Sequence, residues 1–568
     1  MRLINVKTFI HAGFFLVFAL TLAPARLHAA LFEQLAVSGR AMTMGNAVTA
    51  YPPGTMAIHF NPAGLTQIEG SQFDNGIGFV LEQREVTFTQ GRDENGDYWA
   101  PFGGFFNPLN RPEGQPKDPL AGETGKSKLS GYMVVPIVKL ELPLLIVPGM
   151  GFATHPRGSR WTFGIGQYGP FGVGLTHDSH DPLSFLGQKA FFVRLILAAP
   201  AAAYKVSDSL SVGVSVGLGV STFSFGTNMR SPNDMVALTG ALGENTKSLE
   251  IPILSELTLP PPWFGGGLNP YDKVGSLEAL GEDDFTTSYN IGMLWEPKEW
   301  FAFGAVYQSE SEVSMSGDYT FRFSPRFQNM VKWMGSSPLL IVTSAILDLP
   351  TKPTAAQKGR FTVNMTWPSR MQCGVMIKPI DKVRFTCDLH WTDWEAWKAL
   401  ELDFDQKIQL LRLTAILGYL HPANKMVVDL GMKNTYHFSY GMEIQPVDKL
   451  KIRLGYEMRP TSIKDNYFGP VPLPDTTIYS FGIGLDVDKK LKPIPKNAGE
   501  LLKQIEKPNH IDLNFSYVLT KDKYVPSNGS INLNSTNFFI PVYNPYAGLN
   551  FDQKFAIYSI SLNQVYYW

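Results

Sequence analysis

Five basic side chains at alternating positions of predicted strands are the candidates for ligand binding. Alternation places Arg194, Arg370, Arg384, Lys451 and Arg453 on the face opposite the aromatic one. The forked guanidinium group of an arginine holds a carboxylate through two hydrogen bonds. Arg194 and Arg370 are the better candidates, because Arg384 and Arg453 lie close to predicted turns. For any single arginine, however, a structural ion pair with an acid on the same face, such as Asp388, Glu443, Glu457 or Asp512, is the preferred interpretation.

No catalytic or metal-binding constellation stands out in the rest of the chain. The segment HDSHD at 177–181 contains ligand residue types, but its spacing matches no defensible site, and a polar loop is the simpler interpretation. The sequence contains no GxSxG elbow, no P-loop and no HExxH motif. We therefore predict no enzyme, no metal and no cofactor.

The elements that position these residues are strands with period-2 alternation. They occur, for example, at 211–220, 301–308, 361–367, 450–459, 479–487 and 511–517. A soluble sandwich also alternates. Here, however, the apolar face is very aromatic, the other face is rich in Gly and Ser, and each strand has about the ten residues that a tilted strand needs to cross a bilayer. A membrane-spanning barrel is therefore favoured.

Composition agrees with that architecture. Aromatic residues make up 12% of the 568 residues and charged residues 17%. No apolar run after the N-terminus reaches the ~20 residues of a membrane helix. The net charge of −1 gives no indication of a nucleic-acid partner.

Tight Pro/Asp turns alternate with long connections, as in outer-membrane barrels. We predict an all-β, antiparallel barrel of about fourteen strands. The strands are expected near 72, 131, 161, 190, 209, 286, 300, 360, 382, 434, 449, 476, 509 and 555. A long connection at 488–508 lies on the side of the short turns, and we assign it no function. Cys373 and Cys387 flank one turn, and two small apolar side chains are a better interpretation than a disulfide.

The N-terminal region is predicted to contain two different segments. Residues 1–30 read as a secretory signal peptide, with Arg2 and Lys7 before a short apolar stretch and cleavage near Ala29 or Ala30. Residues 31–70 are too few to bury a core of their own and are expected to plug the barrel formed by 71–568. The location predicted by these features is the bacterial outer membrane.

Several motifs together resemble the long-chain fatty acid transport protein (FadL) family, which includes aromatic-hydrocarbon channels. They are Asn61-Pro62-Ala63-Gly64-Leu65, TFGIGQYGPFGVG at 162–174, WTDWEAW at 391–397 and LGYEMRPTSI followed by PLPDTT. The resemblance implies a hatch gated by Asn61, Pro62 and Ala63. It also implies lateral release of the ligand beside a kinked third strand, near Gly164, Gly166 and Gly169. The C-terminal Trp568 resembles the signal read by the barrel-assembly machinery.

Two long outward connections, 227–284 and 323–359, are unusually apolar and could form a ligand groove. The alternative is that they only cap the barrel mouth. The candidate groove residues are Trp263, Phe264, Met330, Trp333, Met334, Leu339, Leu340 and Ile346.

We therefore expect a monomeric channel in contact with outer-membrane lipid that takes up long-chain fatty acids or similar hydrophobic molecules passively. Uptake of aromatic or alkane hydrocarbons is the alternative within this class. A general diffusion porin and a barrel-embedded lipid hydrolase are alternatives from other classes.

Overall fold

The computed structural model describes residues 37–91, 118–127, 131–135, 138–142, 145–232, 234–247, 259–416, 422–464, 475–488, 492–493, 499–500, 504, 506–520, 522–525, 545–546 and 548–568. The predicted signal peptide at 1–30 and the first residues of the predicted hatch lie outside this part of the chain.

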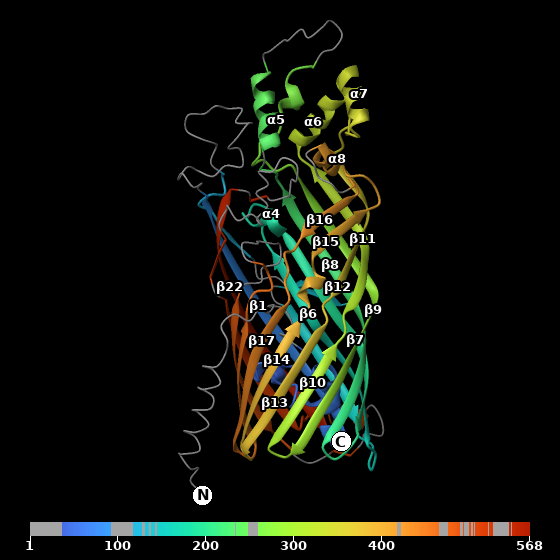
Figure 1. Cartoon of the computed structure of the whole chain (residues 1–568), viewed down its shortest axis with the longest axis vertical. Helices are drawn as coiled ribbons and strands as arrows, with labels where there is room; N and C mark the ends of the chain where they lie inside the picture. The colour runs from blue at the N-terminus through green and yellow to red at the C-terminus, as the bar shows by residue number, and fades with distance from the viewer. Residues whose placement is uncertain are drawn as a thin grey trace.

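One antiparallel sheet of fourteen strands closes on itself, because β22 returns to pair with β1 (Figure 1). Each strand pairs with the next in chain order around the ring. The fourteen are β1 (Ser71–Gln90), β5 (Leu145–Thr154), β6 (Trp161–Thr176), β7 (Lys189–Lys205), β8 (Leu210–Met229), β9 (Gly275–Lys298), β10 (Phe301–Gln308), β13 (Arg370–Ile380), β14 (Val383–Thr392), β17 (Thr435–Val447), β18 (Leu450–Arg459), β19 (Thr476–Asp486), β20 (His510–Thr520) and β22 (Leu549–Tyr567). The predicted barrel and its strand number are confirmed.

Four neighbouring strands continue upward after a break. β11 (Ser311–Phe323), β12 (Ala356–Trp367), β15 (Ala399–Phe404) and β16 (Lys425–Asp429) extend β10, β13, β14 and β17, and they pair with one another and with β9. Short strands β2 (Thr124–Lys126) and β21 (Lys523–Val525) pair with the upper ends of β1 and β22. The two predicted long apolar connections shrink to 230–274 and 324–355, because the strands run further than expected.

The strand predicted near 131 is wrong. β3 (Gly131–Val135) and β4 (Val138–Leu142) form a separate two-stranded sheet, and the barrel strand is β5. Pro136 and Pro143 interrupt this run in the sequence. Since proline has no N–H for a ladder, it separates one apparent strand into a hairpin and a following strand.

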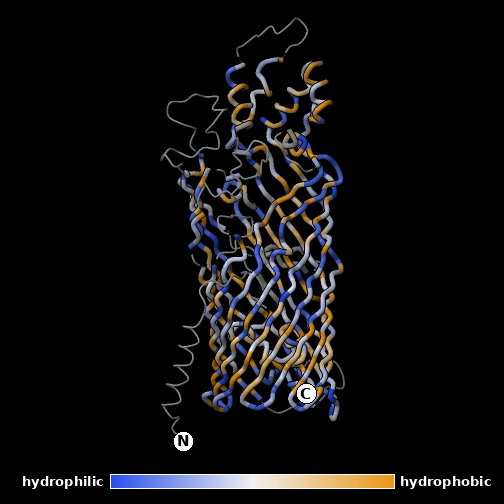
Figure 2. The backbone as a smooth tube through the Cα atoms, in the orientation of Figure 1, coloured by the Kyte–Doolittle hydropathy of each residue, from blue (hydrophilic) through white to orange (hydrophobic). Residues whose placement is uncertain are grey.

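Hydrophobic and hydrophilic residues alternate along the strands of the wall (Figure 2), and the kind that points outward changes between the lower and upper halves. In the lower half of β22, Tyr558 and Ile560 point outward while Ser559 and Ser561 point into the lumen. In the upper half, Lys554 and Asp552 point outward, and the inward side chains are apolar, such as Phe555 and Phe551. The lower wall therefore suits lipid outside and polar contents inside, and the upper wall suits water outside and an apolar core inside.

The N-terminal segment lies inside the lower barrel. It contains α2 (Gly39–Thr43), η1 (Gly54–Met56), α3 (Ala57–Phe60) and η2 (Pro62–Gln67), and most of its side chains are buried. We call residues 37–67 the hatch. It fills the polar part of the lumen, as the sequence led us to expect.

Short helices crown the upper end (Figure 1). They are α4 (Ser184–Gly187), α5 (Asp234–Asn245), η3 (Trp263–Gly266), α6 (Pro325–Met334), α7 (Pro338–Ile346) and α8 (Gln409–Ile416), and η4 (Trp394–Ala396) lies in the wall below them. Ser324 and Ser337 cap α6 and α7, each of which begins with proline. Within the described residues, no helix is both long and apolar enough to cross a membrane.

Candidate functional site

The hatch rests on glycines of the barrel wall. A Cβ added to Gly292 of β9 would lie 2.0 Å from Oδ1 of Asn61, and one added to Gly213 of β8 would lie 2.4 Å from the backbone of Pro62 and Ala63. At Gly304 of β10 the clash would be with the carbonyl oxygen of Thr49, at 2.1 Å. Side chains at these positions would displace the hatch, so the bare backbone of the wall sets its depth in the lumen.

Asn61 fastens the hatch to itself and to the wall. Its Nδ2 donates to the carbonyl oxygens of Thr49 (2.8 Å) and Met293 (2.9 Å), and its Oδ1 accepts from the N–H of Ala63 (3.2 Å). Pro62 is the first residue of η2, where its missing N–H costs nothing. Ala63 is fully buried against Leu294 and Ala302. The Asn-Pro-Ala box thus packs on β8–β10.

A different part of the hatch touches the kinked third strand. The register of β6 against β7 shifts between Gly166 and Phe171, a stretch that contains Gly169. Pairing of β6 with β5 ends at Gln167 and Met150. The Cδ1 atom of Ile58 lies against Gly164 and Gly166, 3.2 and 3.3 Å from the position of an added Cβ. The strand is thus irregular in the stretch where the kink is predicted, and Ile58 rather than Asn61 lies against Gly164 and Gly166.

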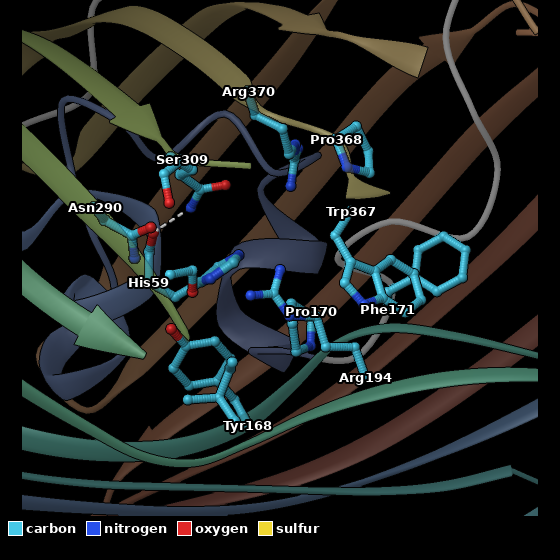
Figure 3. A pocket seen from close by; sticks show the side chains of 13 residues that line it. His59, Tyr168, Pro170, Phe171, Arg194, Asn290, Ser309, Trp367, Pro368 and Arg370 are labelled. Carbon is cyan, nitrogen blue, oxygen red and sulfur yellow. Dashed lines mark hydrogen bonds between the residues drawn. The ribbon is translucent and has the colours of Figure 1, made fainter. Parts of the chain in front are cut away.

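A small cavity lies where the hatch, the kink and the break in the wall meet (Figure 3). Its free space for water-sized molecules is about 50 Å³, which is room for a few waters. A long-chain ligand would therefore require the walls to move. The lining residues are His59, Tyr168, Pro170, Phe171, Arg194, Ile196, Ser288, Asn290, Gln308, Ser309, Trp367, Pro368 and Arg370.

Arg194 and Arg370, which are far apart in the sequence, face this one cavity with His59 between them (Figure 3). Both arginines are 8% exposed. Nε and Nη2 of Arg194 are buried and have no hydrogen-bond partner in the described structure. A buried guanidinium group with unmade hydrogen bonds is costly. The cavity is therefore suited to an anion.

Hatch and wall share the framework of the cavity. The Nε2 of Gln308 donates to the carbonyl oxygen of His59 at 2.6 Å, and the His59 ring packs edge-on against Tyr168, with centroids 4.8 Å apart. The Ser215 hydroxyl donates to the carbonyl oxygen of Ile58 at 2.8 Å. These bonds satisfy carbonyls at the end of α3 and fix His59 in place.

Aromatic side chains form the upper side of the cavity. Phe171 lies 4.7 Å from Trp367 and 5.2 Å from Trp397, and Trp394 lies 5.3 Å from Trp397 (ring centroids). They belong to a continuous apolar core that fills the upper lumen. The arginines thus stand at the boundary between apolar and polar halves of the lumen.

The other predicted arginines have structural partners in the lower lumen. Arg384 and Arg453 each pair with Glu443 at 2.8 Å, and Arg453 also pairs with Asp512. Arg384 stacks on the hatch residue Tyr51, 4.5 Å from its ring centroid. Lys451 lies 3.8 Å from Asp486. Arg384 thus contacts the hatch, and each of these three cations has an acidic partner among the described residues, unlike Arg194.

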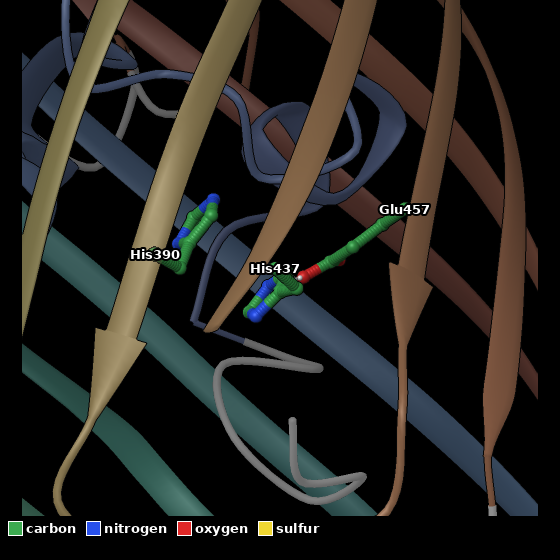
Figure 4. Close-up of side chains that lie close together, drawn as sticks. All are labelled: His390, His437 and Glu457. Carbon is green, nitrogen blue, oxygen red and sulfur yellow. Dashed lines mark hydrogen bonds and ion pairs between the residues drawn. The ribbon is translucent and has the colours of Figure 1, made fainter. Parts of the chain in front are cut away.

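His390, His437 and Glu457 lie close together in the lumen and could hold a metal ion (Figure 4). The two imidazole rings are parallel, with centroids 4.4 Å apart. Glu457 already accepts hydrogen bonds from Nε2 of His437 (2.8 Å), Nε of Arg459 (2.7 Å) and Nδ2 of the hatch residue Asn46 (3.0 Å). Because Arg459 neutralises this carboxylate, we interpret the group as an anchor for the hatch.

The predicted groove residues do not form one surface. Phe264 and Trp333 pack together with centroids 4.9 Å apart, Nε1 of Trp333 donates to the carbonyl oxygen of Pro260, and Met330 and Met334 are buried beneath them. Trp263 is half-buried in η3. Leu339, Leu340 and Ile346 lie on α7, and Ile346 is 77% exposed. Instead of one continuous groove, the structure has two features. One is a packed core between the loops, and the other is an exposed apolar face of α7.

Two minor predictions have clear outcomes. Cys373 and Cys387 are free thiols, and the register pairs them with Leu389 and Val375 rather than with each other. Within HDSHD, Nδ1 of His177 donates to the carbonyl oxygen of Gly187 at 2.6 Å, a bond that fixes the loop.

Sequence reasoning missed His59, Tyr168 and the indoles of Trp394 and Trp397. His59 is the only histidine between residues 31 and 70 and stands two residues before the Asn-Pro-Ala box, which was an available signal. The role of Tyr168 depends on the register shift in β6, which alternation alone does not reveal.

A closed antiparallel barrel of fourteen strands around an N-terminal hatch defines an outer-membrane channel. The family model "Outer membrane protein transport protein (OMPP1/FadL/TodX)" matches residues 23–493, and the chain belongs to this family. Its members carry hydrophobic small molecules through the outer membrane. No curated protein sequence matches the chain.

Solved structures share the fold at low sequence identity. A FadL homologue of Pseudomonas aeruginosa aligns with a TM-score of 0.61 and 15% identity over 95% of this chain and 99% of its own. The toluene transporter TodX of P. putida aligns with a TM-score of 0.53 and 14% identity over 93% and 97%. The toluene transporter TbuX of Ralstonia pickettii aligns with a TM-score of 0.50 and 16% identity over 93% and 97%.

Proposed function

We propose that this channel takes up long-chain fatty acids, or amphiphiles with a similar carboxylate head, passively and down their gradient. The observation that carries the proposal is Arg194, a buried guanidinium group with two unpaired nitrogen atoms facing a cavity that Arg370 also lines. A carboxylate would provide the missing acceptors in the bidentate geometry that guanidinium groups favour.

The chemistry of the lumen supports a path for such a ligand. The upper lumen is apolar, and the arginines lie at its lower boundary. An amphiphile would bind with its head on Arg194 and Arg370 and its chain among Phe171, Trp367 and Trp397. One break in the wall beside the cavity is at β6, where pairing with β5 stops at Gln167. Lateral release there is the exit that we propose.

The hatch is the proposed gate. Ile58 covers the glycines of β6, His59 lies in the cavity, and Asn61, Pro62 and Ala63 fasten this short segment to β8 and β9. A shift of the segment would enlarge the cavity and expose the kink together. The Asn-Pro-Ala box would thus act as the anchor about which the gate moves.

A second candidate function is uptake of monoaromatic hydrocarbons. The aromatic ring cluster above the cavity favours it, and toluene is the cargo named for two of the similar structures. A neutral hydrocarbon would make no use of the arginines, which allows the two functions to be separated.

The test is uptake of labelled oleate and labelled toluene by cells that express the wild type or an Arg194→Ala, Arg370→Ala double variant. We expect oleate uptake to fall about tenfold or more, since two charge-assisted contacts of about 1.5 kcal/mol or more each are lost. Arg360→Ala, which removes an exposed outer-surface guanidinium group, is the matched control and should change nothing.

Toluene uptake with no oleate uptake would assign the chain to the second function. Equal oleate uptake by wild type and double variant would contradict the head-group site. Passage of small sugars at porin-like rates would contradict a hydrophobic channel altogether.

A further inference from the structure

The barrel wall has a second interruption, formed by other strands than β6. Pairing between β13 and β14 ends at Arg370 and Thr392, and pairing between their extensions β12 and β15 begins only at Asn364 and Glu401. Residues 365–369 therefore face residues 393–400 without a ladder. On the other side, pairing stops at Thr392–Thr435 and resumes at Ala399–Asp429. We call residues 393–398, which include η4, the flap.

Cavities lie on both sides of this interruption. Trp367, Pro368 and Arg370 line the inner cavity, while the preceding residues Asn364, Met365 and Thr366 line an open pocket on the outer surface. Ala396 and Lys398 of the flap also line the outer pocket, which has about 570 Å³ of free space. This stretch of β12 and the flap therefore lie between the head-group cavity and the outer pocket.

The flap is bonded mainly along one edge. The N–H of Glu395 donates to Oδ1 of Asn434 at 3.0 Å, and the N–H of Leu430 donates to the carbonyl oxygen of Lys398 at 2.9 Å. Towards β12 and β13, the N–H of Asp393 donates to the carbonyl oxygen of Ser369 at 3.0 Å, at the lower corner. This pattern suits a hinge along the β16–β17 side.

Two indoles close the flap from inside. Trp394 and Trp397 are buried and pack on Phe171, with Trp397 also 5.4 Å from Trp367. Trp367 is tethered, since its Nε1 donates to the hydroxyl of Ser221 at 2.9 Å. The Nε1 atoms of Trp394 and Trp397 are buried without a hydrogen-bond partner in the described residues. Buried donors without acceptors are unfavourable, so the closed flap lacks the polar bonds that would lock it.

The interruption lies at the level of the membrane surface. Directly below it, one cross-strand row of outward side chains is aromatic or large and apolar: Tyr307, Met371, Trp391 and Tyr436. Directly above it, the outward side chains Glu312, Asn364 and Glu401 are polar. Aromatic girdles mark the interface of outer-membrane barrels, so the outer pocket opens at the head-group layer of the outer leaflet.

We propose that the flap covers a lateral entry window, through which long-chain amphiphiles resting in the outer leaflet pass sideways into the cavity. The proposal rests on the proposed function. The outer pocket has mixed charge: Asp283, Glu312 and Lys398 line it, and its third acid, Glu401, is paired with Lys425 at 2.6 Å. The inner cavity presents the cationic groups of Arg194 and Arg370, so a carboxylate head is attracted inward once the flap opens.

The test locks the flap shut. In a Cys373→Ser, Cys387→Ser background, Thr366→Cys and Ala396→Cys are joined across the outer pocket by a short, cleavable bis-maleimide. The matched control joins Thr362→Cys to Asp403→Cys, which are direct partners in the β12–β15 ladder just above the window. Heat-dependent gel mobility checks that each variant is folded. A photoreactive fatty acid is then placed in the outer leaflet, and labelled peptides are mapped by mass spectrometry.

We expect label on residues 393–400 and on the hatch peptide that contains His59. Locking should lower the hatch label at least threefold, cleavage of the linker should restore it, and the control should not change. Equal hatch label in locked and control proteins would overturn the window and leave the proposed function standing. Label on the flap alone would reduce the outer pocket to a binding site without passage. Absence of label from both regions would contradict the window and the fatty-acid function together.

Discussion

Two arginines in the same lumen show how partners decide the role of a residue. Arg453 is held by Glu443 and Asp512, so its charge is neutralised in place. Arg194 has two buried nitrogen atoms without an acceptor in the described residues. Removing Arg453 would leave two buried acids without a counter-charge. Removing Arg194 would instead remove a buried charge whose hydrogen bonds are not all made. The first arginine therefore compensates two acids of the wall, and the second has nitrogen atoms that the proposed carboxylate ligand could use.

At the residue scale, Gly292→Ala should loosen the hatch. The added Cβ would lie 2.0 Å from Oδ1 of Asn61, so Asn61 must give up its bonds to Thr49 and Met293. The expected result is measurable swelling of proteoliposomes in small sugars, which the wild type should exclude. Gly226→Ala is the control, since its Cβ would meet only ordinary contacts beyond 3.4 Å. Wild-type exclusion of sugars by Gly292→Ala would refute the seating role of this glycine.

Alternation in the sequence was sufficient to place Arg194 and Arg370 on the inner face, but it could not bring them together. Their proximity depends on the register shift between Gly166 and Phe171 and on the break at Pro368 and Ser369. Each irregularity changes which residues lie opposite one another. The sequence therefore predicted which residue types lie on the inner face. It could not predict that they meet in one cavity, because register shifts and strand breaks leave no periodic pattern in the sequence.

At the element scale, the reversal of chemistry along β22 determines what each position tolerates. Ile560 faces lipid, whereas Asn550 is outward-facing on the same strand above the reversal. Ile560→Arg should destabilise the barrel by about 2–4 kcal/mol and Asn550→Arg by about 0–1 kcal/mol. Urea unfolding in lipid vesicles, followed by gel mobility, would measure both. Equal effects would contradict the assigned membrane boundary.

The connection between β6 and α4 should respond to pH. Burial, followed by the nearby positive charge of Arg84, lowers the pKa of His177 to about 4. An unfolded histidine has a pKa near ~6.5, so the packed loop is fully stabilised above that pH. It loses this stabilisation, about 3 kcal/mol in total, as the pH falls towards 4.

Hydrogen exchange of residues 177–188 should therefore quicken between pH 6.5 and 4 beyond the intrinsic change of the exchange rate. His177→Gln, which cannot be protonated in this range, should abolish the pH dependence. A pH-independent loop in the wild type would show that His177 is not the group that controls its opening.

For the whole molecule, the barrel and its number of strands followed from alternation and turn chemistry, because the membrane-spanning part of each strand faces lipid on one side. The strand near 131 failed because prolines broke an apolar run that otherwise looked continuous. The extent of the upper wall was also missed. Above the membrane, the apolar residues of the strands point inward. The composition of these strand extensions therefore resembles that of an apolar connecting loop, and the sequence does not distinguish the two.

The lower and upper halves of the barrel differ both in what surrounds the wall and in what fills the lumen. The hatch, bonded to polar side chains of the wall, sits inside the lipid-facing section, and an apolar core sits inside the water-facing section. The cavity with Arg194 lies where these halves meet. A ligand that is itself apolar at one end and charged at the other can bind across this boundary, and neither half alone would suit it.

The pairing of β1 with β22, from Gln72–Tyr567 to Gln90–Leu549, carries a kinetic consequence. It joins the two ends of the chain, so it is the contact of highest sequence separation in the wall, and contacts of that kind form slowly. Until they form, both strands present long rows of unpaired N–H and C=O groups, each of which costs several kcal/mol in hydrocarbon. The ring must therefore either close before it enters the bilayer or have both edges shielded by another protein while it does so.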